Sequence, residues 1–153
     1  MTARTVQVTF DCHDPESLSR FWAEALGYVL PAPPGRTVEP GEDVFPLWHE
    51  FLREAGVPES EWTSSSAAQD PDGVGPRLFF QRVPEGKTAK NRLHLDVRVG
   101  TGLVGDERVA ALEAECERLT ALGATKVRLM RADGFNESCL VMQDPEGNEF
   151  CLD

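Results

Sequence analysis

Four side chains that can ligate a metal fall at corresponding places in two similar halves of the chain. Gln7 and His94 each lie in the middle of an alternating, strand-like segment, and Glu149 lies in the last such segment of the second half. Gln81 is the candidate counterpart near the end of the first half. A histidine nitrogen, a carboxylate and one or two amide oxygens suit a borderline divalent ion with open coordination positions. Such an ion, Zn²⁺, Ni²⁺, Mn²⁺ or Fe²⁺, would polarise a substrate carbonyl or activate water.

Each of these residues also has a structural interpretation. His94 is flanked by leucines and can be a hydrogen-bonded core or pocket residue, while Glu149 can be a solvated carboxylate at a strand end. Gln7 alone indicates little. The correspondence between the two halves is what favours metal ligation over these alternatives.

Three more residues are candidates for contact with a substrate. Phe79 shares a strand face with Gln81, and Asp96 shares one with His94, whose tautomer a carboxylate could hold. Asp96 could equally form ordinary ion pairs with nearby arginines. Trp48 lies in an apolar run with helical spacing, which favours core packing unless that helix covers a pocket.

The candidate ligands are positioned by a repeated pattern of strand, helix and strands. Residues 6–12 alternate apolar and polar side chains, and a helix follows between Asp14 as N-cap and Gly27 as C-cap. The second half repeats this with a strand at 93–99 and a helix at 106–122. An Asp-Pro-acid-Gly turn stands in each half, at 70–73 and at 144–147.

The rest of the pattern completes an α+β fold. Residues 44–55 have helical spacing and predict a helix inserted into the first half. Further strands are expected at 77–83, 125–131, 137–143 and 148–152. The prediction is a single domain, 1–153, of two modules, the first about 4–84 and the second about 91–153.

Composition limits the partners and the compartment. The net charge of -11 argues against nucleic acid and anionic membrane, which would repel the protein. No apolar leader or membrane-length apolar run is present, so a cytoplasmic location is expected. The four cysteines form no Cys-x-x-Cys pair and are interpreted mainly as reduced, small buried side chains: Cys12, Cys116, Cys139 and Cys151.

Three segments carry a resemblance to a known family: 14–27, 80–97 and 144–150. The chain resembles the vicinal-oxygen-chelate superfamily of glyoxalase I, bleomycin-resistance proteins and extradiol dioxygenases, and is most similar to its glyoxalase-like domain proteins. The resemblance implies two βαβββ modules whose mixed sheets form a cup. It also implies metal positions in the first and last strands of the modules, which are Gln7, His94, Glu149 and, with uncertain register, Gln81.

The resemblance implies two competing functions. One is a metal-dependent lyase or isomerase of glyoxalase type, in which Glu149 ligates the metal or acts as the base. A dioxygenase is disfavoured because Gln7 stands where its metal site would have a histidine. The alternative is a metal-free protein that binds an antibiotic or metabolite, as bleomycin-resistance proteins do. Either would act on a small molecule, and the resemblance implies a homodimer.

Overall fold

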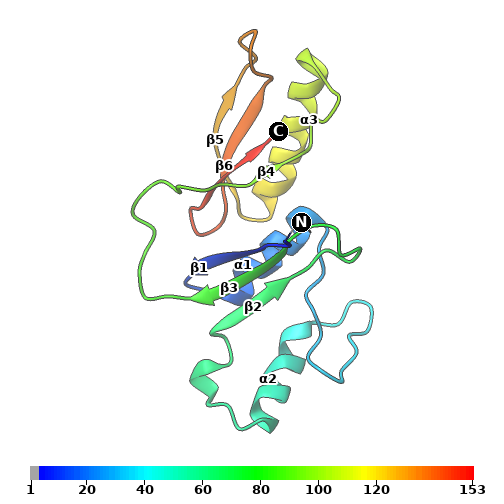
Figure 1. The fold of residues 1–153 in the computed structure, drawn as a ribbon, viewed down its shortest axis with the longest axis vertical. Helices are drawn as coiled ribbons and strands as arrows, with labels where there is room; N and C mark the ends of the chain where they lie inside the picture. The colour runs from blue at the N-terminus through cyan, green and yellow to red at the C-terminus, as the bar shows by residue number, and fades with distance from the viewer. Residues whose placement is uncertain (1–3) are drawn as a thin grey trace. The chain divides into compact units, whose positions relative to one another are not determined.

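A computed structural model describes residues 4–153. The chain divides into two compact units, the first ending at Gly86 and the second running from Lys87 to Asp153. Each unit pairs helices with one mixed sheet (Figure 1). The α+β fold predicted from the sequence is confirmed.

Unit 1 contains a three-stranded sheet in the order β1-β3-β2. β1 and β3 run parallel, and β2 pairs with β3 antiparallel at the edge. Its elements are β1 (Gln7–Cys12), α1 (Pro15–Leu26), α2 (Val44–Glu54), the 3-10 turn η1 (Glu59–Glu61), β2 (Ser65–Ala68) and β3 (Arg77–Arg82).

Helix α1 begins and ends where its capping residues predict. The Asp14 carboxylate accepts a hydrogen bond from the Ser17 backbone N–H at 3.0 Å, and Gly27 closes the helix at a φ of 69°. The buried face of α1 packs on the sheet, where the rings of Trp22 and Phe10 have centroids 5.3 Å apart. The opposite face of the sheet, with Gln7 and the other polar positions of β1, stays exposed.

Two features of unit 1 differ from the prediction. Strand β2 forms in a serine-rich stretch that has little β-propensity, because pairing with β3 satisfies its backbone. The remaining strand expected of a βαβββ module is reduced to an isolated bridge between Val29 and Gln69. The part of unit 1 that the structure describes therefore has a sheet of three strands.

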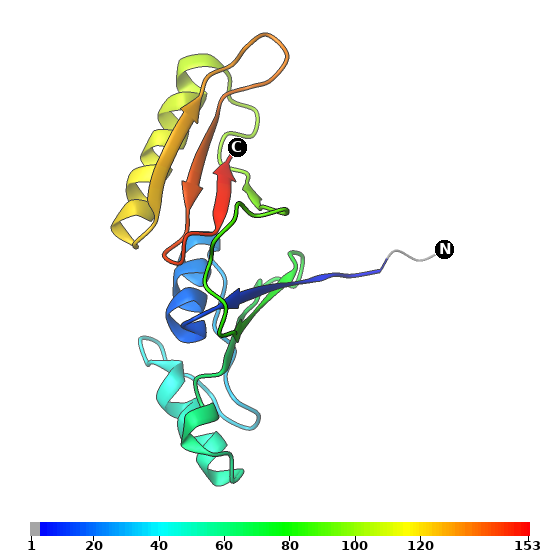
Figure 2. The same ribbon diagram turned by 90° about the vertical axis from the view of Figure 1, so that its left-hand side faces the viewer.

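Unit 2 contains a four-stranded sheet in the order β4-β7-β6-β5. Helix α3 covers one face of this sheet (Figure 2), and apolar residues of both fill the space between them. Its elements are β4 (Asp96–Val97), α3 (Gly105–Ala121), β5 (Thr125–Met130), β6 (Cys139–Gln143) and β7 (Glu149–Leu152).

The two units share a connectivity in which the first strand pairs in parallel with the last. β1 pairs with β3 in unit 1, and β4 pairs with β7 in unit 2. β4 is shorter than the strand expected at 93–99, although backbone bonds from Cys151 to Leu95 and from Asp153 to Val97 extend the contact. None of the described helices is both long and apolar enough to cross a membrane.

A buried arginine ties the end of unit 2 together. The Arg108 guanidinium donates to the Ser138 carbonyl at 2.8 Å, the Gly100 carbonyl at 2.7 Å and the Asp153 carboxylate at 2.5 Å. Gly100 leaves room for this arrangement, since a Cβ there would lie 2.8 Å from the Arg108 Nη1. No sequence pattern predicted a buried charge on α3, whose apolar stripe is otherwise as expected.

Candidate binding pocket and polar clusters

A cavity of about 250 Å³ lies within unit 1, between α2, the loops that flank it and the β2–β3 part of the sheet. Its walls are mainly aromatic and aliphatic, with a few polar groups. Its lining includes Trp48, Leu52, Trp62, Phe79, Glu16 and Arg77.

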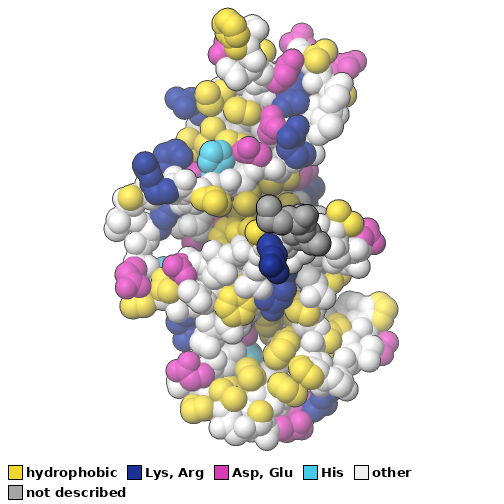
Figure 3. All heavy atoms as spheres, viewed as in Figure 1, with side chains coloured by type: hydrophobic (Ala, Val, Ile, Leu, Met, Phe, Trp, Pro, Cys, Tyr) yellow, Lys and Arg dark blue, Asp and Glu magenta, His cyan; other side chains and the backbone are white. Residues whose placement is uncertain are grey.

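The apolar face of α2 is directed at this cavity. Four of its apolar residues line the cavity: Val44 and Phe45, which are buried, and Trp48 and Leu52, which are half-buried. Apolar side chains are also visible at the surface over the α2 end of unit 1 (Figure 3). A helix with an apolar face that borders empty space has room for another apolar group.

The indole N–H groups of the two tryptophans already have partners. Trp48 Nε1 donates to the Pro31 carbonyl, and Trp62 Nε1 donates to the Val57 carbonyl, both at 2.8 Å. These hydrogen bonds orient the two indole rings, and the carbon atoms of the rings line the cavity. A ligand therefore meets apolar surface at both positions.

The lining also contains charged groups. Glu16 Oε1 lies 2.7 Å from His49 Nε2, and the His49 ring stacks on Trp62 with centroids 5.8 Å apart. Arg77 stands over the Phe79 ring, 5.4 Å from its centroid. The lining thus contains the Glu16 carboxylate, which His49 holds in place, and the Arg77 guanidinium, which has a second partner besides the Phe79 ring.

That other partner is Gln7, one of the predicted metal ligands. The Gln7 amide oxygen accepts from Arg77 Nη1 at 2.6 Å, so a cation already occupies the atom that would ligate. Gln81 donates instead to Asp11 at 2.7 Å. The register pairs Gln7 with Arg77 and Asp11 with Gln81, four positions apart. At ~3.3 Å per residue this separates the two glutamines by about 13 Å along the strands, too far to share one ion.

Glu149 is likewise engaged within unit 2. Its carboxylate accepts from the Asn91 backbone N–H at 2.9 Å and pairs with Lys87 Nζ at 3.0 Å. These interactions, the Asn91 bond foremost, lower the pKa of Glu149 to about 2. The carboxylate therefore orders the segment 87–91, and its lowered pKa makes it a weak general base.

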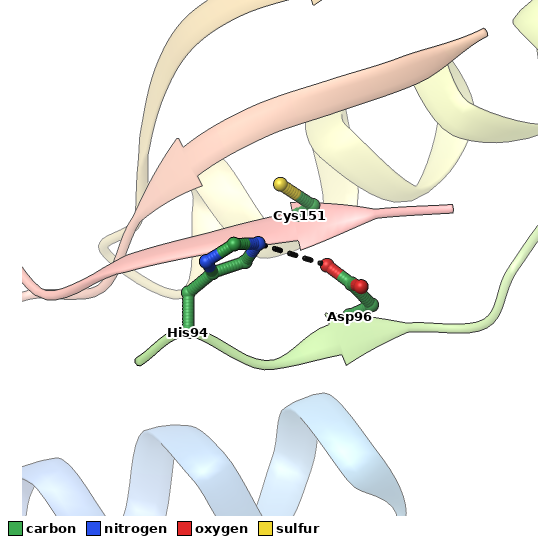
Figure 4. A group of neighbouring side chains, drawn as sticks. All are labelled: His94, Asp96 and Cys151. Carbon is green, nitrogen blue, oxygen red and sulfur yellow. Dashed lines mark ion pairs between the residues drawn. The ribbon is translucent and has the colours of Figure 1, made fainter. Parts of the chain in front are cut away.

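His94 lies beside two other potential ligands. His94 Nε2 is 3.3 Å from Asp96 Oδ1, and Cys151 stands opposite Asp96 on the adjacent strand (Figure 4). One ligand atom from each of these three residues lies within 4.8 Å of the others. Burial, followed by the neighbouring Asp96 charge, raises the pKa of the Cys151 thiol to about 11. Gln7, Gln81 and Glu149 thus already have protein partners, whereas His94 lies in a cluster with Asp96 and Cys151.

The glyoxalase-like domain family model matches residues 7–152, nearly the whole chain. The chain belongs to the glyoxalase-like domain family. This confirms the superfamily that the sequence resembles, and the duplicated α+β connectivity agrees with it. A search of curated proteins found no match.

Solved structures share the glyoxalase-like fold at low sequence identity. A glyoxalase/bleomycin resistance protein/dioxygenase family enzyme from Burkholderia phytofirmans PsJN is 14% identical, with a TM-score of 0.57, over 95% of this chain and 94% of that one. A fosfomycin resistance protein FosX from Listeria monocytogenes, complexed with Mn(II), is 10% identical with a TM-score of 0.57, over 99% and 90%. A glyoxalase-related enzyme from Fulvimarina pelagi is 18% identical with a TM-score of 0.53, over 98% and 87%. At these identities the likeness concerns the fold.

Sequence reasoning missed several residues of these clusters. Glu16, His49 and Trp62 meet at the pocket only because α1, α2 and the segment after η1 come together in space. Cys151 was interpreted with the other cysteines as a small buried side chain, and it is half-buried. Strand alternation could have indicated that Cys151 lies near the candidate ligands, because it shares a strand face with Glu149, two residues earlier.

Proposed function

We propose that this glyoxalase-like protein binds a compact, mainly apolar small molecule in the unit 1 cavity. The observation that carries the proposal is the apolar face of α2, which borders about 250 Å³ of space instead of a filled core. This volume lies just below the ~300–1,000 Å³ typical of small-molecule sites, which favours a compact ligand. Phe79 and Trp48, two of the three predicted substrate contacts, line the cavity. Asp96 belongs to unit 2.

The charged groups of the cavity lining indicate a ligand with a basic group. Two glutamates, Glu16 and Glu61, line the cavity together with one arginine, Arg77. The Arg77 guanidinium is bonded to Gln7, whereas a cation in the cavity can meet carboxylates and aromatic rings of the lining. The overall charge of -11 also attracts cations from solution. Binding of such a molecule without a metal corresponds to the second function that the resemblance implies, that of a metal-free antibiotic- or metabolite-binding protein.

Intrinsic tryptophan fluorescence tests the proposal directly. All three tryptophans lie in unit 1, two on the cavity wall and Trp22 in the core with 1% of its surface exposed. The probe pair is benzyltrimethylammonium and its uncharged carbon isostere neopentylbenzene. Saturable quenching by the cation, weaker for the isostere, is expected. Equal or absent responses to both would contradict a basic-ligand pocket.

A matched pair of leucine variants on α2 locates the site. Leu52 lines the cavity, whereas Leu47 is half-buried on the same helix and is not among the lining residues. Leu52→Ala removes apolar contact area worth about 1.5 kcal/mol, which corresponds to about tenfold weaker binding. Leu47→Ala is expected to bind as the wild type does. Equal losses in both variants would place the ligand elsewhere.

The competing function, a metal-dependent lyase or isomerase on Gln7, His94, Gln81 and Glu149, receives less support. Gln7 and Glu149 have protein partners at the oxygen atoms that would ligate the metal. The Gln81 amide nitrogen donates to Asp11. Thermal shift with Ni²⁺, Zn²⁺, Mn²⁺ and Fe²⁺ separates the functions. Stabilisation that Glu149→Gln and Gln7→Ala both abolish would favour the lyase or isomerase.

The expected homodimer and cytoplasmic location stay predictions. Light scattering at several protein concentrations measures the first, and fractionation of cells that express the untagged chain measures the second.

A further inference from the structure

Unit 2 presents three chemically different metal ligands at one point on its exposed sheet face. Asp96 and Cys151 are direct partners in the parallel β4–β7 pair, and His94 lies two residues before Asp96 in the segment that leads into β4. Figure 4 shows the imidazole and the carboxylate directed at each other, with the thiol on the neighbouring strand. Asp96 and Cys151 come from paired strands, which position side chains more rigidly than a loop would, and His94 lies two residues before β4 begins.

The spacing of these groups is that of ligands around a small tetrahedral ion. Bonds of 2.0–2.3 Å to nitrogen, oxygen and sulfur place tetrahedral ligand atoms about 3.3–3.8 Å apart. His94 Nε2 and Asp96 Oδ1 are already 3.3 Å apart, and all three ligand atoms lie within 4.8 Å of one another. Shifts of the ligand atoms by up to about one ångström would bring all three to tetrahedral spacing. The side chains have room for such shifts, because all three are at least partly exposed.

The charge around the cluster distinguishes it from Glu149. In residues 4–153, no lysine or arginine forms an ion pair with Asp96, whose only such contact is His94. Glu149, by contrast, is neutralised by Lys87. A cation at the cluster would meet a carboxylate that has no lysine or arginine partner, whereas a cation at Glu149 would have to displace an ammonium group.

We propose that His94, Asp96 and Cys151 form a binding site for a borderline divalent ion of the zinc class. Nitrogen, oxygen and sulfur together suit Zn²⁺ or Co²⁺ better than Mg²⁺ or Ca²⁺, which prefer oxygen alone. The ion has three protein ligands and a fourth position open toward solvent. The site keeps His94 from the set that the family resemblance implies, and replaces Gln7, Gln81 and Glu149 with Asp96 and Cys151.

Co²⁺ titration of the full chain, purified without a histidine tag, tests the composition of the site. A thiolate ligand gives Co²⁺ a sulfur-to-metal charge-transfer absorption in the near ultraviolet, which nitrogen and oxygen ligands do not give. We expect this band at one equivalent of Co²⁺ and its loss when Zn²⁺ displaces the cobalt. Absence of bound Co²⁺, or bound Co²⁺ without the band, would overturn the proposal.

Single substitutions assign the ligands. Cys151→Ser is expected to abolish the band, and His94→Ala and Asp96→Asn to weaken Zn²⁺ binding by more than the ~10–100-fold typical of indirect partners. Cys139→Ser is the matched control, since Cys139 is a free and half-buried cysteine of the same sheet. Glu149→Gln should bind within about threefold of wild type, below that same indirect range. Circular dichroism of each variant checks folding.

The two candidate sets give opposite outcomes. Binding that disappears in Glu149→Gln and persists without the band in Cys151→Ser would contradict the proposal and favour the set implied by the family. Loss in Cys139→Ser equal to that in Cys151→Ser would contradict it as well. The proposed ligand pocket in unit 1 is independent of either result.

Discussion

Replacement of the buried Arg108 by methionine should destabilise unit 2 strongly. Methionine keeps most of the apolar stem and has a helix propensity close to that of arginine. It removes all three hydrogen bonds of the guanidinium, to Gly100, Ser138 and Asp153. The Ser138 carbonyl loses its partner at a buried position, which water reaches poorly, whereas the Gly100 carbonyl keeps a hydrogen bond from the Leu103 N–H at 2.9 Å.

The loss of stability in Arg108→Met depends on how deeply the guanidinium is buried and on which partners Asp153 keeps. Loss of one partner from a buried ion pair costs ~3–5 kcal/mol. The Arg108 side chain is only 6% exposed, but Asp153 is 29% exposed and keeps a second ion pair with Arg98 at 3.0 Å. The lower end of the range applies, so we expect the free energy of unfolding to fall by about 3 kcal/mol.

Native-state hydrogen exchange of the β6 and β7 amides measures this loss in unit 2. A decrease of about 3 kcal/mol raises their exchange about 150-fold, because each 1.36 kcal/mol is a factor of ten. Tryptophan fluorescence in urea follows unit 1 separately, since the tryptophans Trp22, Trp48 and Trp62 all lie there.

Arg118→Met is the matched control on the same helix. Arg118 pairs with Glu115 one turn earlier, and its side chain is 44% exposed. Exposed pairs of this kind contribute ~0.3–0.5 kcal/mol, so the control should change exchange by less than about threefold. If both variants lost equal stability, or if Arg108→Met lost less than about 1 kcal/mol, the argument from buried hydrogen bonds would be refuted.

Three further predictions concern other parts of the fold. Asp14→Ala should lower the free energy of unfolding by about 1 kcal/mol through loss of the α1 N-cap, measured by urea denaturation, and Asp14→Ser should restore most of it. Gly75→Ala should destabilise unit 1 by about 1–3 kcal/mol, because a Cβ there overlaps the Tyr28 hydroxyl; Gly86→Ala, where the nearest atom is 3.9 Å away, should not. The pKa of Glu149 is lowered from 4.5 to about 2, so its contribution is complete above about pH 4.5 and is lost as the pH falls toward 2. The stability gap between wild type and Glu149→Gln should therefore shrink between pH 6 and pH 3 in urea denaturation, and a constant gap would contradict the assigned pKa.

Local signals made the helices and turns predictable. Helix α1 begins after Asp14 and ends before Gly27, and α2 and α3 lie within one residue or so of the expected 44–55 and 106–122. Capping, helical spacing and the two Asp-Pro turns are contained in a few adjacent residues, so they can be recognised without the fold. The family resemblance rested on three segments, 14–27, 80–97 and 144–150, and the family model that matches residues 7–152 confirms it.

Partners distant in sequence decided the chemistry. Gln7 meets Arg77, and Glu149 meets Lys87 and the Asn91 backbone, contacts that span about 60 to 70 residues. No local pattern contains these contacts, because strand register and loop path determine them.

The sequence by itself determined the α+β class, the repeated connectivity and the faces on which His94, Glu149 and Phe79 lie, because alternation and capping are local. Only the tertiary structure decided what those faces meet. Pairing of β4 with β7 set Cys151 opposite Asp96, and α2 with the loops beside it enclosed a cavity against β2 and β3. Side-chain direction follows from the chain, whereas a ligand set or a pocket requires the neighbours that folding brings into contact.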